Sequence, residues 1–313
     1  MTVSMRVPNL MNNAQSMLDL QRIKQDYANT VQQLSSGQAI VNLGDNPAGT
    51  AQIMNYQSSI DQNDQYVANA NTATAQLQTA STSLNSLVSE LDRMLTLGQE
   101  ALSGTATASS QAGIATEVDA IRTNMIALGN TQSQGKYIFA GTNTTASPFT
   151  NVPSTGAPNY NPPTVTYQGN NSAINLEVAP NNQVQTNVTG SQVFFGAGGQ
   201  GSATDLLAQA ANLWTGLMNN NTAAIQTAYN NLQSISGQLN VTVAQVGDRA
   251  NGVTQAQTNL NAFNQTLTTL QSSVASVNYP TAIVNLNQDS VAQQATLSAI
   301  AQSNTKNLFS YLA

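Results

Sequence analysis

Two stretches near opposite ends of the chain carry the pattern that decides its fold. They are LQRIKQDYANTVQQL at residues 20–34 and IVNLNQDSVAQQATLSAI at residues 283–300. In both, apolar residues recur three and four positions apart, which places their side chains on one stripe of a helix that a second helix covers. We therefore predict that the two ends of the chain pack together as partner helices. The candidate packing residues are Leu20, Ile23, Tyr27, Leu34, Ile283, Leu286, Leu297, Ile300, Leu308 and Tyr311.

The composition is unusually poor in charge. Only 7% of the 313 residues are charged and the net charge is −6, whereas about a quarter of the residues in a typical protein are charged. Amide and hydroxyl side chains take their place, and these can be buried against similar surfaces without the desolvation cost of a charge. The composition favours a subunit surrounded by copies or relatives of itself. A low-charge soluble rod is the alternative.

Several classes of function lack the residues that they need. Eight Lys and Arg residues are spread thinly over the chain, so we expect no nucleic-acid partner. We also expect no membrane span and no cleavable secretory signal, because no suitable apolar run occurs. Cysteine and histidine are absent, which removes disulfides, thiolate ligands, imidazole bases and histidine metal sites. We predict no enzyme, no cofactor and no metal site.

Three weaker patterns have ordinary structural explanations. Asp61 and Asp64 share a predicted helix face, but no pocket residues accompany this carboxylate pair, so a solvated or partner-facing role is favoured. Asp45 and Asn46 resemble part of a calcium loop, although helix capping explains them better because further oxygen ligands are missing. The glycine-rich GAGGQG at 196–201 lacks the context of a phosphate-binding loop.

Two very long helices are predicted inside the terminal segments. Asn46 followed by Pro47 is typical of a helix start, and one apolar register continues from Ile53 to Leu102. A helix over 47–102 would be about 80 Å long. A shorter helix is predicted around 114–128, and a second long register runs from Ile225 to Val274 before Asn278, Tyr279 and Pro280 interrupt it.

The middle of the chain changes to a β-type pattern. From Lys136 onward, short runs of β-branched and aromatic residues alternate with prolines and glycines. We predict strands at 137–139, 165–169, 173–178, 184–188 and 193–196. Helix then resumes after SATD at 202–205, which has the spacing of a capping box with Asp in place of Glu.

The predicted fold is mainly α, a rod of long antiparallel coiled-coil-like helices with paired terminal helices and a small inserted β-rich domain. We divide it into three domains. Residues 1–46 and 279–313 form the terminal helical domain, 47–135 and 202–278 the long-helix rod, and 136–201 the inserted β-rich outer domain.

Four motifs resemble the bacterial flagellin and hook-associated protein family. LSSGQAIVNLGDNPAGTAQI at 34–53 is similar to the segment that follows the first helix in that family, and NLFSYLA at 307–313 is similar to its C-terminal ending. VGDRANGV at 246–253 resembles part of the family's long return helix. QGKYIFAGTNTTASPF at 134–149 is the discriminating motif, and it resembles the hook–filament junction proteins, hook-associated protein 3, through Tyr137, Ile138, Phe139, Ala140 and Gly141.

The chain also departs from the family pattern. Gln38 and Ala39 stand where relatives often have a basic pair, and Asp45-Asn46 stands where Asp-Asp is common. These departures leave flagellin itself open as an alternative to a junction protein.

The resemblance implies a structural function in the bacterial flagellum. The terminal helices would pack in the inner tube of a helical assembly, and the β insertion would face outward. The implied partners are copies of the chain, the hook-side junction protein (hook-associated protein 1), flagellin and a cytosolic export chaperone. The implied location is extracellular, after export through the flagellar type III apparatus.

A different class of function also stays open. The β insertion could be an adhesin or glycan-binding module on a stalk, with Tyr160, Tyr167, Phe194 and Phe195 stacking on sugars. Strand cores use the same aromatic residues more often.

Overall fold

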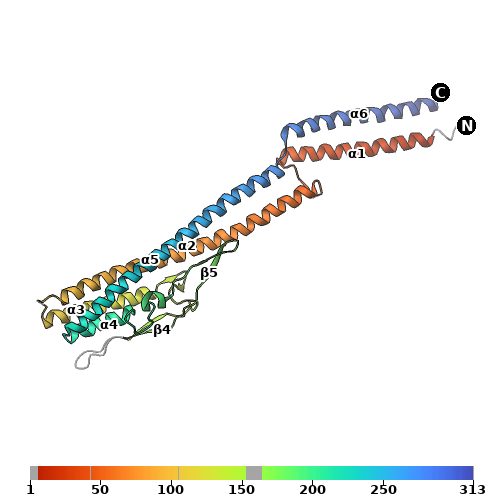
Figure 1. Cartoon of the computed structure of the whole chain (residues 1–313). Coiled ribbons are helices and arrows are strands. Elements are labelled where there is room, and N and C mark those ends of the chain that lie inside the picture. Colours follow the sequence, from red (N-terminus) through yellow and green to blue (C-terminus); the bar gives the residue numbers. More distant parts are fainter. Residues whose placement is uncertain (1–5, 43, 105, 153–163, 313) are drawn as a thin grey trace. The chain divides into compact units, whose positions relative to one another are not determined.

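The computed structural model describes residues 6–42, 44–104, 106–152 and 164–312, and their side chains between 14 and 302. It is mainly helical, as predicted (Figure 1). The helices are α1 (Arg6–Ser36), α2 (Pro47–Ala101), α3 (Ala108–Gly129), α4 (Leu206–Met218), α5 (Thr222–Ala275) and α6 (Tyr279–Leu312).

The chain forms two compact units, which are described separately below. Unit 1 comprises residues 1–62 and 263–313, and unit 2 comprises residues 63–262. The division between them falls inside α2 and α5. The three-domain division with limits at 46, 135, 201 and 278 stays a prediction.

The core of unit 2 is built on two heptad patterns. Within α2, the buried apolar side chains recur at alternating steps of three and four residues. In α5 they follow the same stepping up to Leu239 and then recur every seven residues. Such a 3.5-residue average repeat is the signature of helices that pack knobs into holes. The α2 set is Ala70, Ala73, Leu77, Ala80, Leu84, Leu87, Leu91 and Met94, and the α5 set is Ile225, Ala228, Leu232, Ile235, Leu239, Val246 and Val253.

The parts of α2 and α5 within unit 2 are antiparallel. Gln257 donates a hydrogen bond to the Asn71 side chain at 2.7 Å, and Gly98 lies against the ring of Tyr229. As residue numbers rise along α2, those of the neighbouring α5 residues fall. The predicted pairing of the two long helices is confirmed.

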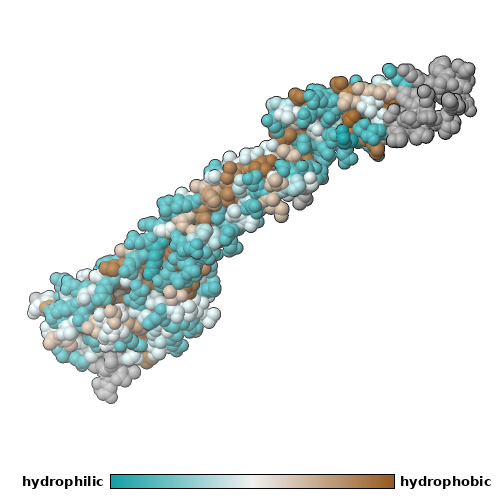
Figure 2. Space-filling view, turned by 45° about the vertical axis from the view of Figure 1, so that its right-hand side comes forward, coloured by the Kyte–Doolittle hydropathy of each residue, from teal (hydrophilic) through white to brown (hydrophobic). Residues whose placement is uncertain are grey.

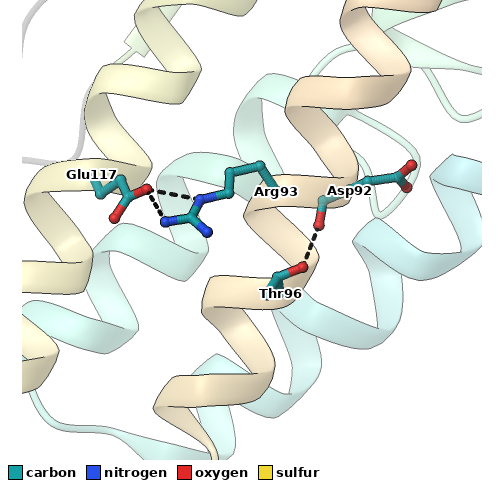
Figure 3. Close-up of polar contacts among 4 residues, drawn as sticks. All are labelled: Asp92, Arg93, Thr96 and Glu117. Carbon is teal, nitrogen blue, oxygen red and sulfur yellow. Dashed lines mark hydrogen bonds and ion pairs between the residues drawn. The ribbon is translucent and has the colours of Figure 1, made fainter.

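The helices α3 and α4 complete this core. The buried face of α3 includes Ile114, Val118, Ile121 and Met125, on the predicted register. An exposed ion pair links α2 to α3, because Arg93 Nε and Nη2 donate to one Glu117 oxygen at 2.8 and 2.6 Å (Figure 3). Since both side chains are about half exposed, the pair adds little stability.

The predicted start of the first long helix is confirmed. The Asn46 side chain accepts a hydrogen bond from the backbone N–H of Gly49 at 2.9 Å, immediately before Pro47 opens α2. The Asp45 carboxylate accepts from the N–H of Asn42, so it stabilises the preceding turn. Asn278 accepts from the N–H of Thr281 at the start of α6, after the predicted break.

The predicted capping box at SATD is wrong in its assignment. Asp205 is itself the N-cap of α4, and it accepts from the N–H of Ala208 at 3.0 Å and from that of Gly201 at 2.7 Å. Ser202 instead donates to the carbonyl of Gly199 within the preceding turn. The buried carboxylate therefore ties the glycine-rich return loop to the helix.

The inserted segment forms three separate antiparallel hairpins in the described residues. Strand β1 (Gln132–Ser133) pairs with β2 (Lys136–Tyr137), β3 (Phe149–Val152) with β4 (Thr164–Tyr167), and β5 (Asn175–Ala179) with β6 (Asn182–Gln185). Gln134 and Gly135 both have positive φ angles in the first turn, as a two-residue type I′ hairpin requires. Strands β1 and β3 had no clear signal in the sequence.

The predicted strand at 193–196 is wrong, because Ser191–Phe195 form a short π-helix, η1. Val193, Phe194 and Phe195 are all buried, which a strand with alternating faces could not achieve within one core. Phe194 packs against Phe149 at 4.6 Å between ring centroids, and Phe195 packs against Tyr167 at 5.4 Å. The predicted strand at 137–139 also ends early, at Tyr137.

Burial raises the pKa of the Asp205 carboxyl above the usual range of an aspartate, which generates a prediction for pH dependence. A raised folded-state pKa means that protonated Asp205 favours folding, so its contribution is full below the unfolded pKa and is lost as pH rises through the folded pKa. Asn in its place is neutral, but it loses the bond from Gly201 at a cost of about 1 kcal/mol. The stability advantage of the native chain over Asp205→Asn should therefore shrink as pH rises above the unfolded-state pKa of the aspartate and through its raised folded-state pKa.

Urea unfolding of both proteins from acid to neutral pH measures this difference. An advantage of the native chain that grows with pH would contradict the raised pKa.

Candidate assembly interface

In unit 1, α1 and α6 pack side by side, as the terminal repeats predict (Figure 1). The covered residues follow heptad spacing on both helices, with every member buried or half-buried. On α1 this seam contains Ser16, Leu20, Ile23, Tyr27, Thr30 and Leu34. On α6 it contains Ala282, Leu286, Asp289, Gln293, Thr296 and Ile300.

Backbone hydrogen bonds hold the two helices together at one end. Gly37 ends α1 with a φ of +73°, and its carbonyl accepts from the N–H of Val277 at 3.0 Å. The N–H of Ala39 donates to the carbonyl of Ala275 at 2.6 Å. These bonds position the connections to α1 and α6 next to each other.

The buried apolar content of unit 1 is small. Its fully buried apolar side chains, among those described, are Leu20, Leu267 and Ala282. By contrast, eleven of the thirteen large apolar side chains that are exposed lie in this unit. They are Met17, Leu18, Val31, Met54, Phe263, Leu270, Tyr279, Ile283, Val284, Val291 and Leu297. Figure 2 shows hydrophobic residues at the surface of the terminal helices.

On α6, several polar side chains are covered while several large apolar ones are exposed. The covered seam includes Asp289, Gln293 and Thr296, whereas Val284 and Val291 on its outer side are 53% and 66% exposed. A helix of a finished globular protein turns its apolar stripe inward. An exposed apolar patch of this kind marks an interaction surface.

The predicted packing residues occupy different environments in the single chain. Leu20 is buried, and Ile23, Tyr27, Leu34, Leu286 and Ile300 are half-buried in the α1–α6 seam. Ile283 and Leu297 are about half exposed on the outer side of α6. Leu308 and Tyr311 lie outside the residues whose side chains are described. The role of all these residues in assembly stays a prediction.

The sequence pattern missed Val284 and Val291. These residues are seven positions apart, so a second heptad stripe was the available signal. Periodicity alone does not show which of two stripes on a helix faces its own chain.

The residues of the YIFAG motif anchor the β insertion in unit 2. Ile138, Phe139 and Ala140 are buried, and Tyr137 is half-buried. The carbonyl of Phe139 accepts from the N–H of Gly190 at 2.7 Å and from the hydroxyl of Tyr167 at 2.9 Å. The motif thus joins three segments that are distant in the sequence.

A second anchor comes from α5. Arg249, within the VGDRANGV motif, donates from Nη1 to the carbonyl of Asn187 at 3.2 Å. The Asn187 side chain in turn accepts from the N–H of Ile174 at 2.8 Å. The β insertion is therefore attached to the long helix by side-chain to backbone bonds.

Two observations bear on the hypotheses of a metal site and of a glycan-binding surface. No group of three or more acidic residues in the described part of the chain could hold a metal ion. Phe194 and Phe195 are buried, which removes them as an exposed sugar platform, while Tyr160 lies outside the described residues. Among the described residues, none of the helices combines the length and the hydropathy that a membrane span requires.

Comparison with known proteins shows what the chain is similar to. Residues 7–144 match the model of the bacterial flagellin N-terminal helical region. The predicted resemblance to the flagellin and hook-associated protein family is therefore confirmed, and it extends over residues 7–144.

Two curated proteins to which the chain is similar are named flagellar hook-associated protein 3. The chain is 26% identical to the Salmonella typhimurium protein over 195 residues, which cover 61% of this chain and 57% of the relative. It is 27% identical to the Escherichia coli protein over 146 residues, or 46% of each. The chain spans about half the length of the curated relatives it matches.

Solved structures share the fold at lower identity. A putative flagellar hook-associated protein from Vibrio parahaemolyticus superposes with a TM-score of 0.64 at 18% identity, covering 74% of this chain and 100% of that one. A flagellar hook-associated protein 3 from Legionella pneumophila gives 0.59 at 14% identity, covering 71% and 98%. These likenesses support the long-helix architecture with an inserted β segment.

The surroundings of Gly141 generate a prediction about the YIFAG motif. Gly141 has a φ of +68°, and a Cβ atom there would lie 2.2 Å from the carbonyl oxygen of Asn170. Gly141→Ala should therefore lose about 1–2 kcal/mol from the left-handed backbone and a further loss of about 1–3 kcal/mol from the steric clash.

Gly135→Ala is the matched control. Gly135 has a φ of +76° but open space around the Cβ position, so it should suffer only the backbone loss. Denaturant unfolding measures both variants. Equal losses would show that the contact with Asn170 does not constrain the motif.

Proposed function

We propose that this chain is a structural subunit of the bacterial flagellum and that it forms the junction between hook and filament. The observation that carries the proposal is the concentration of exposed apolar side chains in unit 1, where the terminal helices pair. The similarity to proteins named flagellar hook-associated protein 3 supports the assignment. In this proposal, assembly covers the terminal helices with neighbouring subunits.

The proposed partners follow from this position. Copies of the chain lie beside it, hook-associated protein 1 contacts it on the hook side, and flagellin contacts it on the filament side. A cytosolic chaperone accompanies the chain before export through the flagellar apparatus, without a cleavable signal. The absence of cysteine suits such a route, because the chain cannot become crosslinked by disulfides.

The proposed role is non-enzymatic. The sequence contains no histidine or cysteine, and its buried acidic group Asp205 is occupied by backbone N–H groups as a helix cap. Assembly through helix packing needs no reacting group. The extracellular location is part of the same proposal.

Flagellin is the second candidate, favoured by the match to the flagellin N-terminal helical region. The two candidates differ in abundance and position. Immunogold labelling confined to the filament base supports the junction protein, whereas labelling along the whole filament supports flagellin.

Deletion of the gene tests the junction function. The deletion strain should build hooks but release flagellin into the medium, because filament subunits lack their attachment point. Flagellin in the medium and electron microscopy of the cells measure this outcome. Normal filaments on the deletion strain would refute the proposal.

A charge on the outer side of α6 should block assembly without unfolding the chain. Val291 is 66% exposed, so Val291→Asp should change the unfolding free energy by less than about 0.5 kcal/mol. An unpaired carboxylate buried by a neighbour, however, costs several kcal/mol. The variant should fail to restore motility to the deletion strain.

Val241→Asp provides the matched control, since Val241 is 58% exposed but lies in unit 2. It should restore motility. Loss of motility in both variants, or in neither, would contradict the assignment of the outer side of α6 to assembly.

A further inference from the structure

A pocket of about 400 Å³ lies in unit 2, between α2, the β1–β2 hairpin and the segment that contains β5 and β6. Its volume is within the range of sites that hold small molecules. Its apolar lining consists of Ala80, Ile138, Ile174 and Leu176, and hydroxyl and amide side chains form most of the rest. We call this the insertion pocket.

One part of the lining is held in place by hydrogen bonds within the chain. Asn187 is 5% exposed, and its side chain donates to the carbonyl of Ser172 at 3.0 Å and accepts from the N–H of Ile174 at 2.8 Å. The hydroxyl of Thr142 accepts from the side chain of Asn170 at 2.8 Å. This part of the pocket is therefore pre-formed, because neighbouring groups already orient its polar side chains.

Another part of the lining carries hydrogen-bonding groups that the chain leaves unused. Gln76 on α2 and Thr144 are half-buried, and neither side chain has a hydrogen-bond partner among the described residues. Ser133 is 9% exposed, and the bond that its hydroxyl makes, with the hydroxyl of Thr79, is 3.4 Å long. That bond is weak, because O–H···O bonds are commonly about 2.7–2.8 Å and Thr79 already donates to the carbonyl of Ala75 at 2.8 Å. An amide and two hydroxyls in the lining can therefore bond to a ligand.

Lys136 is the only charged residue in the lining of the pocket. Unit 2 has three other basic residues, of which Arg93 and Arg122 each pair with a carboxylate and Arg249 donates to a backbone carbonyl. Lys136 has no such partner within the part of the chain that the structure describes, and Glu177 on β5 does not line the pocket. The ammonium group is therefore available to one negative charge of a ligand.

These three features together select the class of ligand. The apolar lining suits the C–H groups of a small ring, and the unused amide and hydroxyl groups suit several hydroxyls of a ligand. The single ammonium suits one carboxylate, whereas a second carboxylate would have no cationic partner. A wholly apolar ligand would leave the polar groups of the lining buried without partners, which is costly. A sugar with one carboxylate meets all three requirements.

We propose that the insertion pocket binds a monosaccharide that carries one carboxylate, such as a uronic acid or a sialic acid. The carboxylate bonds to Lys136, and hydroxyls of the sugar bond to Gln76, Ser133 and Thr144. The inference goes beyond the proposed function, because the lining contains no residue of the terminal helices. It also differs from the predicted stacking surface, whose described aromatic residues do not line the pocket.

The test is isothermal titration calorimetry of the purified full chain with acidic sugars. The probes are glucuronic acid and N-acetylneuraminic acid, and each is compared with its methyl ester, which lacks only the charge. At least one acid should bind about tenfold more tightly than its ester, because a hydrogen bond to a charged group is roughly twice as strong as one to a neutral group.

Lys136→Gln removes the ammonium group and should weaken the binding of the acid by about tenfold. Lys24→Gln is the matched control, since Lys24 is an exposed lysine of α1 that does not line the pocket, and it should bind the acid as the native chain does. Gln76→Leu should weaken the acid and the ester alike, because it removes hydrogen bonds without changing the charge. Thermal unfolding verifies that each variant is folded.

Three results would overturn the inference. They are no binding of either acid, equal binding of acid and ester, and equal affinity of Lys136→Gln and Lys24→Gln for the acid. Tighter binding of N-acetylglutamate amide than of both sugars would also overturn it, because the pocket would then be a site for acidic side chains of a partner protein. None of these results changes the phenotype expected of the deletion strain, so the pocket and the junction function are tested separately.

Discussion

The structure depends on one constraint: an apolar side chain on a helix gains free energy when it is covered, and in unit 1 many large apolar side chains are not covered by the chain itself. In unit 2, the heptad seams of α2 and α5 are closed by α3, α4 and the aromatic residues of the β insertion. In unit 1, α1 covers only one side of α6, and apolar side chains such as Val284 and Val291 stay exposed outside it. The helices of unit 1 are therefore paired, but the unit exposes apolar side chains that a neighbouring molecule could cover.

The scarcity of charged residues lowers the free-energy cost of burying the helix surfaces of unit 1 against a neighbouring subunit. Helices of ordinary coiled coils carry Glu and Lys beside the seam, and these groups would be expensive to bury against a neighbour. Here amides take that position, as in the bonds between Gln57 and Gln271 in unit 1 and between Asn71 and Gln257 in unit 2. Amide pairs can be exchanged for similar pairs with a neighbouring subunit at small cost.

Most of the helical fold could be predicted because periodicity directly reports which side of a helix is covered. The starts of α2 and α6 followed from Asn46-Pro47 and from Asn278–Pro280. The π-helix at Ser191–Phe195 could not be predicted, because its burial depends on Phe139, Phe149 and Tyr167, which are brought to it by tertiary structure. The exposure of Val284 and Val291 on α6 was missed for a related reason: the sequence shows apolar residues on more than one side of the helix, but packing decides which side the chain covers itself.

Hydrogen exchange of α6, compared between the isolated chain and assembled flagella, tests the central claim most directly. The account predicts that residues 279–302 exchange much faster than the α2 core of unit 2 in the isolated chain, because local stability follows buried contacts. In assembled flagella, the same residues should become strongly protected while the α2 core changes little. Protection of α6 equal to that of the α2 core already in the isolated chain, with no gain on assembly, would contradict the account.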